Sequence, residues 1–409
     1  TMCATTVAQL SCLPISCMYF GHFSLLAPLS SALITSLFSL LSLFGIGAIA
    51  LCWFKPAQDV AFCLVDFLGQ FIEALTSFLS ERSFASVSLI DMSWIVSLLV
   101  FAAMVALYVF WPKGKRVVLS GICLMVFMLI LGLSIYWKFF SPTRICVMDI
   151  GQGDAILLSD GAHSLLVDTS VGDVVNDALE RQHISYLDAI LLTHLDEDHA
   201  GGVRYMVGSV KAGRVLVGEG ITKQEKPELQ KAIQRISGSG SYEVLYGDEF
   251  DVGRFHVRVV WPQRGYKAKE ANNASVELYV TYNDGQNTLT TLLTGDAERD
   301  QTKETVDSGD VGDIDFLKVG HHGAAKSLYP ETARALKPEV AIASAGKNNR
   351  YGHPKQEAVD ILEGVGARFY CTKDYGDVTV FPGEHGPRVS VQHAKVDTEL
   401  EEEKDGGAG

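Results

Sequence analysis

Long apolar stretches fill the first third of the chain, and the remainder alternates between short apolar and polar runs. No charged residue precedes Lys55, and residues 2–20 and about 30–54 are each long enough to cross a membrane, which takes about 20 residues. Residues 93–111 and 117–137 form two further stretches of that length. The pattern therefore predicts a transmembrane α-helical segment with several spans over residues 1–140.

The loop between the last two predicted spans sets the expected topology. Residues 112–116 read Pro-Lys-Gly-Lys-Arg, and short loops with several basic residues are typical of the cytoplasmic side of a membrane. The following span would carry the chain across. We therefore predict a multi-pass protein of the inner (cytoplasmic) membrane whose residues 141–409 lie outside it.

Residues 57–80 differ from the predicted spans because they carry charge on one side. Asp59, Asp66 and Glu73 are seven residues apart, which places them on one stripe of a helix. One interpretation is an amphipathic helix in the membrane interface with a wet acidic face. The other is an acidic wall that lines a polar conduit.

From residue 143 the pattern predicts short strands alternating with helices. The expected helices cover residues 171–182, 225–235, 297–306, 327–335 and 355–363, and the strands lie at 144–150, 155–159, 164–167, 187–192, 214–217, 255–260, 276–281, 288–293, 316–319, 340–344, 368–371 and 378–381. This order favours a layered α/β domain over residues 141–394, with two sheets and helices outside them. Residues 395–409 are acidic, end in glycine, and are expected to be disordered.

Charge separates the same two regions. The net charge of the chain is −14, yet residues 1–140 hold only six basic and five acidic residues, so residues 141–409 carry a net charge of −15. This distribution excludes a single uniform globular domain, a wholly disordered chain and a generally basic nucleic-acid binder.

The strongest chemical signal is the segment Thr-His-Leu-Asp-Glu-Asp-His-Ala-Gly-Gly at residues 193–202, directly after an apolar strand. Imidazole nitrogens and carboxylate oxygens are ligands that zinc and manganese accept. Two other strands also end in metal-type residues: Asp296 follows 292–295, and His321 and His322 follow 315–320. Each of these alone could equally be a turn aspartate or a packed histidine pair, but their repetition favours a shared metal site.

These motifs, in this order, resemble those of the metallo-β-lactamase superfamily, and more closely those of the ComEC-type competence proteins. The resemblance also includes MDIGQGDA at 148–155, LLVDT at 165–169, NNASVEL at 272–278, YGHP at 351–354 and the apolar segment at 8–29. It covers residues 8–395 and implies that an N-terminal portion of the family is missing. The implied fold is an αββα metallo-β-lactamase-like sandwich that follows the end of a competence membrane domain.

The resemblance implies a set of metal ligands for one or two divalent ions, Mn or Zn. His194 and Asp196 would face one ion, Asp198 and His199 the second, and Asp296 would bridge both. His321 would complete the second site, with its neighbour His322 as the alternative. The superfamily's further histidine is missing: His256 lies inside an alternating strand, and residues 272–275 occupy its place. We expect Asp154 and Asp168 to support the ligands rather than to bind metal.

Hydrolysis at such a site needs more than the metal ligands. Asp198 would also orient the attacking water, and His353 would protonate the leaving group, with Lys326 as the second candidate. Basic residues near the last two motifs could form a rim for phosphates around an acidic domain, or could be ordinary surface charges: Lys318, Lys326, Lys347, Arg350 and Lys355.

The resemblance implies a membrane protein of DNA uptake in natural transformation. Its helices would form part of a conduit for single-stranded DNA, and its outer domain would be a metal-dependent nuclease that degrades the strand not imported. The expected partners are DNA, the lipid membrane and other DNA-uptake components, and an oligomer is compatible with the sequence. The missing histidine favours an alternative, a catalytically silent module that binds DNA and guides it to the channel. A third hypothesis is a tethered hydrolase of another small substrate.

Overall fold

The computed structural model describes residues 26–80 and 141–393, the short strands β1 (His22–Ser24) and β2 (Ser86–Ser88), and single helical positions at residue 8 and between 109 and 140. The chain divides into two compact units. The first comprises Thr1–Lys138 with His183–Ser185, and the second comprises Phe139–Gln182 with Tyr186–Gly409. The predicted spans 2–20, 93–111 and 117–137 lie almost wholly outside the described residues, as does the predicted tail 395–409.

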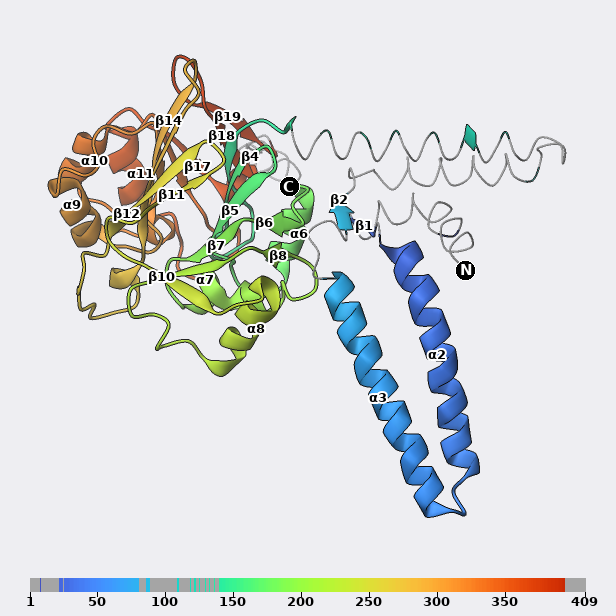
Figure 1. The fold of residues 1–409 in the computed structure, drawn as a ribbon. Coiled ribbons are helices and arrows are strands. Elements are labelled where there is room, and N and C mark those ends of the chain that lie inside the picture. Colours follow the sequence, from blue (N-terminus) through green and yellow to red (C-terminus); the bar gives the residue numbers. More distant parts are fainter. Residues whose placement is uncertain are drawn as a thin grey trace, which may run out of the picture. The chain divides into compact units, whose positions relative to one another are not determined.

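Two helices dominate the described part of the first unit (Figure 1). Helix α2 (Ala27–Ala50) has 24 residues, and within the described part of the chain it is the helix long and apolar enough to cross a membrane. It starts three residues before the predicted span and ends four residues earlier. Helix α3 (Lys55–Ser80) confirms the helix predicted over 57–80, and it packs along α2.

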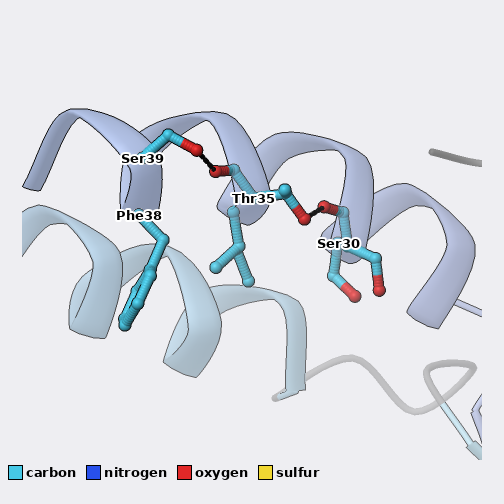
Figure 2. A pocket seen from close by; sticks show the side chains of 6 residues that line it. Ser30, Thr35, Phe38 and Ser39 are labelled. Atoms are coloured by element: carbon cyan, nitrogen blue, oxygen red, sulfur yellow. Dashed lines mark hydrogen bonds between the residues drawn. The ribbon is translucent and has the colours of Figure 1, made fainter. Parts of the chain in front are cut away.

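Several hydroxyl groups on α2 donate hydrogen bonds within the helix itself. Figure 2 shows Ser30, Thr35, Phe38 and Ser39 around a shallow pocket of about 350 Å³. The Ser39 hydroxyl donates to the Thr35 carbonyl at 2.8 Å, and the Thr35 hydroxyl donates to the Ser31 carbonyl at 2.5 Å. Because these bonds return to the preceding turn, the side chains leave no unpaired donor in an apolar setting.

The second unit is a sandwich of two sheets, and this confirms the layered α/β prediction. The eight-stranded sheet has the order β10 (Ser241–Val244), β9 (Val215–Gly218), β7 (Ala189–Leu192), β5 (His163–Val167), β4 (Ile156–Asp160), β3 (Arg144–Val147), β18 (Val378–Phe381) and β19 (Arg388–Val391). The seven-stranded sheet has the order β11 (Glu249–Val252), β12 (Phe255–Trp261), β13 (Glu277–Asn283), β14 (Thr288–Leu293), β15 (Phe316–Lys318), β16 (Val340–Ala343) and β17 (Arg368–Cys371).

Helices cover the outer faces of both sheets (Figure 1). Helices α6 (Val174–Arg181) and α8 (Pro227–Ser237) accompany the eight-stranded sheet, and α9 (Arg299–Asp307), α10 (Pro330–Leu336) and α11 (Gln356–Glu363) accompany the other. Shorter elements are α7 (Glu197–Ala200), α12 (Thr372–Tyr375), the paired strands β6 (Tyr186–Leu187) and β8 (Lys211–Ala212), and the 3₁₀ turns η2 (Gly201–Arg204), η3 (Asn272–Ala274) and η4 (Gly320–Gly323).

The main hydrophobic core lies between the sheets. It joins alternate residues of both sheets, such as Ile145 and Val147 from β3 with Val257 and Phe316 from β12 and β15. A second cluster packs α10 and α11 against the outer face of the seven-stranded sheet. Because the central strands are covered on both faces, they read as continuous apolar runs in the sequence.

Strand direction brings the chemistry-bearing segments to one edge. Strands β5 and β7 run parallel in one sheet, and β14, β15 and β16 run parallel in the other. Parallel strands end at a common edge, so the residues that follow β5, β7, β14 and β15 can meet there. These are the segments that contain Asp168, the 194–199 cluster, Asp296 and the histidine pair.

Glu277 gives the fold a predictable pH dependence. It is fully buried on β13 and accepts a hydrogen bond from the Thr302 hydroxyl at 2.8 Å. Burial raises the pKa of Glu277 from 4.5 to about 7, although the hydroxyls of Thr305 and Thr302 act in the opposite direction. The folded state therefore holds this proton more tightly than the unfolded chain. The contribution of Glu277 to the free energy of unfolding is therefore fully present below pH 4.5 and is lost as the pH rises to about 7.

We predict that Glu277→Gln removes this loss. The wild type should lose roughly 3 kcal/mol more stability than the variant between pH 4.5 and 8. Denaturant unfolding of the detergent-solubilised chain at several pH values measures the difference. Glu363→Gln, at the exposed end of α11, is the control and should keep the wild-type profile. Identical pH profiles for Glu277→Gln and the wild type would contradict the prediction.

Candidate metal centre

His199 lies at the centre of the cluster and is held by Asp168. Its Nδ1 is 2.7 Å from Asp168 Oδ2, and both side chains are fully buried. Asp168 also accepts hydrogen bonds from the Thr193 backbone N–H and hydroxyl at 2.8 and 2.7 Å. The carboxylate therefore fixes the orientation of the imidazole and leaves its Nε2 facing Asp296 Oδ1 at 3.2 Å.

His194 is positioned in the same way by a hydroxyl. Its Nδ1 lies 3.0 Å from Ser275 Oγ, and the ring is 4.1 Å from that of His199 between centroids. The Asp296 backbone N–H donates to the same Ser275 oxygen at 3.1 Å. Ser275, the last residue of the segment 272–275, thus supports the His194 ring through its Nδ1.

His322 approaches from the other sheet. Its Nδ1 faces Asp154 Oδ1 at 3.5 Å, and its Nε2 is 3.5 Å from Asp198 Oδ2 and 3.6 Å from Asp296 Oδ1. The second oxygen of Asp154 accepts a hydrogen bond from Lys318 Nζ at 2.7 Å, with both side chains fully buried.

The donor atoms at the centre of the cluster fit a divalent metal ion. His194 Nε2, His199 Nε2, His322 Nε2 and Asp296 Oδ1 are buried and make no hydrogen bond. Leaving such atoms unpaired costs about 1–3 kcal/mol each, which a bound cation would offset. Ligand-type atoms lie within 4.8 Å of one another in several overlapping groups, among them one of His194, His199 and Asp296 and one of Asp198, His199 and His322. The imidazoles supported by Asp168 and Asp154 match the usual arrangement behind metal-binding histidines.

The electrostatics of the cluster also favour a cation. Burial lowers the pKa of His199 and His322, but Asp296 and neighbouring carboxylates outweigh it, so both pKa values are raised, that of His322 to about 9. Burial raises the pKa of Asp296, and the adjacent imidazoles reverse this and hold it well below its usual value. The pocket therefore stabilises positive charge.

Asp196 and Asp198 lie nearer the solvent than the histidines. Asp198 is 36% exposed, and the His322 imidazole, whose Nε2 lies 3.5 Å from its Oδ2, is the main reason that the pKa of Asp198 is lowered. Asp196 is 52% exposed, and its Oδ2 lies 3.8 Å from His194 Nε2. Asp198 thus belongs to the cluster, whereas Asp196 lies at its border. Among the contacts of the described residues, Asp196 approaches one cluster histidine, His194.

The structure places His322, rather than His321, in the cluster, which reverses the expected preference. Both residues have left-handed backbone angles, with φ of 47° and 56°, and this turn directs successive side chains to different surroundings. The ring of His321 is partly exposed, and its Nδ1 lies 3.6 Å from Glu298. His322 is 2% exposed and faces Asp198 and Asp296.

The two candidate proton donors occupy different settings. His353 is buried, its ring is 5.9 Å from that of His321, and its Nδ1 makes no hydrogen bond. Burial, followed by the neighbouring His322 and His321, lowers the pKa of His353 to about 4, so its ring is neutral at neutral pH. Lys326 is exposed on the turn after η4.

Lys318 departs from the expected basic rim. It lies on β15, all three residues of which are buried, and its ammonium pairs with Asp154 instead of facing solvent. The other four residues of the predicted rim, Lys326, Lys347, Arg350 and Lys355, are exposed. The strand pattern at 316–319 was a signal that Lys318 is inside the fold, but its partner could not be identified from the sequence.

Comparison with known families agrees with the predicted fold class. Residues 148–347 match the model of the metallo-beta-lactamase superfamily. Similar solved structures include Tm1679, described as a metal-dependent hydrolase of the beta-lactamase superfamily, and YhfI from Bacillus subtilis. Both have a TM-score of 0.38, at 14% and 12% identity, and each match covers 56% of this chain and 95% of that structure. These scores are low, and the class is defined by the family model: the second unit is a metallo-β-lactamase-like domain.

The first unit defines the particular family. Residues 1–114 match the model of the competence protein family. The ComE operon protein 3 of Bacillus subtilis is 28% identical over 91% of this chain, and the competence protein ComA of Neisseria gonorrhoeae is 26% identical over 92%. The chain spans 50% of the length of each. It combines a competence domain with a metallo-β-lactamase-like domain, as a ComEC-type competence protein does, and the predicted family is confirmed.

We predict that His322→Ala and His321→Ala have different effects on metal binding. Loss of a donor from the cluster should weaken affinity for Zn²⁺ or Mn²⁺ by at least about tenfold, whereas loss of the neighbouring ring should leave affinity nearly unchanged. Elemental analysis of the detergent-solubilised chain, dialysed against buffered metal, gives both values. The assignment of His322 is wrong if His321→Ala is the variant that loses metal.

Proposed function

We propose that this chain is part of a DNA-uptake protein whose second unit is a metal-dependent nuclease that degrades the DNA strand not imported. The observation that supports it most directly is the convergence of unpaired buried imidazole and carboxylate atoms in a chain of the competence family. Superfamily membership supports a metal-dependent hydrolase, and the competence family supports DNA as the substrate.

The proposed ligands come from both sheets. His194, His199, His322 and Asp296 would hold one or two divalent ions together with Asp198, and Asp196 would join at the solvent side. The donor set contains nitrogen and oxygen atoms without thiolate, which suits Zn or Mn. When bound, such ions lower the pKa of water and stabilise charge that develops on a phosphoryl oxygen.

Asp198 and His353 would assist hydrolysis beside the metal ligands. Asp198 is partly exposed at the cluster, so its carboxylate can accept a hydrogen bond from an attacking water and orient it. His353 is neutral and lies on the side of His321, so it would donate a hydrogen bond to the leaving oxygen rather than a full proton. Lys326 is the alternative group for protonation.

The first unit would form part of a conduit for single-stranded DNA in the inner membrane. Helix α2 has the length and composition of a membrane span, and α3 packs along it. Asp59, Asp66 and Glu73 are exposed on α3, which fits either an interfacial helix or an acidic wall of the conduit. Lipid and other DNA-uptake components would be the partners of this unit.

A catalytically silent DNA-binding module is the second candidate. The observation that favours it is the incomplete surroundings of His194, where Ser275 contacts Nδ1 and the exposed Asp196 lies 3.8 Å from Nε2. A site of this kind would bind metal weakly at this position. It would guide DNA without cleaving it.

We predict that the detergent-solubilised chain cleaves labelled DNA with Mn²⁺ or Zn²⁺ and that a chelator abolishes cleavage. Asp198→Ala and Asp296→Ala should lower the rate by at least about 100-fold, because they remove groups that hold metal or orient water. Asp251→Ala, an exposed aspartate on β11, is the matched control and should retain the wild-type rate. Cleavage that persists without metal contradicts the proposal, and DNA binding without any cleavage favours the silent module.

The proposed topology gives a separate test. Alkaline phosphatase fused after residue 150 should be active, because that position would lie outside the cytoplasmic membrane. A fusion at residue 114, inside the basic loop, should be inactive. The reverse pattern would place the metallo-β-lactamase-like domain in the cytoplasm.

A further inference from the structure

A rigid loop lies beside the metal centre and presents an exposed aromatic ring. Asn349 clamps the loop, because its side-chain N–H groups donate to the carbonyls of Gly346 and His353 at 2.8 and 2.9 Å, and its Oδ1 accepts the His353 backbone N–H at 2.7 Å. Tyr351, between these anchor points, is 48% exposed. The loop is therefore preorganised, so little conformational entropy would be lost in ordering it when a ligand binds.

Tyr351 is supported on one side and flanked by a cation. Its ring stacks on that of His353, with a centroid separation of 5.8 Å and an interplanar angle of 14°. The guanidinium carbon of Arg350 lies over the Tyr351 ring, 5.0 Å from its centre, and the Nη2 of Arg350 donates to the tyrosine hydroxyl at 2.9 Å. A planar, half-exposed surface backed by a fixed imidazole is suited to stacking against a flat ligand.

The loop is joined to the turn that carries His321 and the cluster residue His322. The Lys355 backbone N–H donates to the Gly323 carbonyl at 2.8 Å, and a side chain at Gly323 would collide with Pro354. The ring of His353 is 5.9 Å from that of His321, the neighbour of His322. Tyr351 is thus connected to the histidine turn through one intervening ring, His353.

The charge of the loop is opposite to that of the domain around it. Residues 345–356 contain Lys347, Arg350 and Lys355 and no acidic residue, whereas residues 141–409 carry a net charge of −15. All three cations are exposed. A polyanion is therefore attracted to this loop in preference to the rest of the acidic domain.

We propose that Tyr351 is a stacking platform for a nucleobase of the DNA strand whose phosphate lies at the metal centre, with Arg350 and Lys355 contacting its backbone. This inference rests on the proposed function, because it takes the strand at the metal centre to be DNA. Stacking needs the face of a base, which is covered in an intact duplex, and it tolerates any sequence because every base has such a face. The domain therefore engages unpaired or frayed strands and discriminates little between bases.

The test measures binding of the full detergent-solubilised chain to a fluorescent single-stranded oligodeoxynucleotide, with chelator present so that no cleavage occurs. Tyr351→Ala should raise the Kd by about 5-fold to 150-fold, the effect of losing one stacked base. Tyr351→Trp and Tyr351→Phe should bind as the wild type does. Tyr242→Ala removes a tyrosine of similar exposure (53%) on the edge strand β10, and it should change nothing.

An oligonucleotide of abasic sites separates stacking from backbone contact. The wild type should bind it more weakly, and Tyr351→Ala should then cause no further loss, whereas Arg350→Ala should weaken binding to both oligonucleotides. The inference is overturned if Tyr351→Ala has no effect, or if it weakens binding to the abasic strand as much as to the intact one. Metal-dependent cleavage is measured separately. Its absence would refute the nuclease proposal while the binding results still decide the role of Tyr351.

Discussion

The candidate metal centre depends on two buried imidazoles, those of His194 and His199, which are held through Nδ1 and left unpaired at Nε2. Asp168 holds His199 at 2.7 Å, and Ser275 holds His194 at 3.0 Å, so both free nitrogens turn toward Asp296. A buried polar atom without a partner is costly, and the surrounding core must stabilise the arrangement until a cation is bound. Metal binding at this candidate centre would therefore be linked to the stability of this edge of the sandwich.

A buried ion pair supports the same centre from the opposite sheet. Lys318 on β15 reaches Asp154, which follows β3, and Asp154 in turn faces His322. The Lys318 ammonium and His322 lower the pKa of Asp154 against the effect of its burial, so the carboxylate stays charged behind the imidazole. Because the two partners come from different sheets, the pair connects the sheets at the centre. Loss of either partner would leave an uncompensated buried charge.

Local charge, rather than the charge of the whole domain, decides what this surface attracts. The second unit is strongly acidic, and its carboxylates at the centre favour cations. The 345–356 loop is basic and lies beside that centre. Under the proposed function, an acidic domain would receive a polyanion at one point, where bound metal and the basic loop would act together. The acidic residues elsewhere repel it.

The sequence by itself determined the apolar helix α2, the central strands and the segments that carry the chemistry. Buried strands are continuous apolar runs, and His194, His199 and Asp296 follow such runs. It did not reveal β10, β11 and β19, which are half-exposed edge strands with weak alternation. Only the tertiary structure decided which of His321 and His322 faces the cluster. Only the tertiary structure, too, showed that Lys318 is buried. A left-handed turn sets which neighbouring side chain faces the cluster, and the partner of a buried charge comes from a distant strand, so neither is encoded in local spacing.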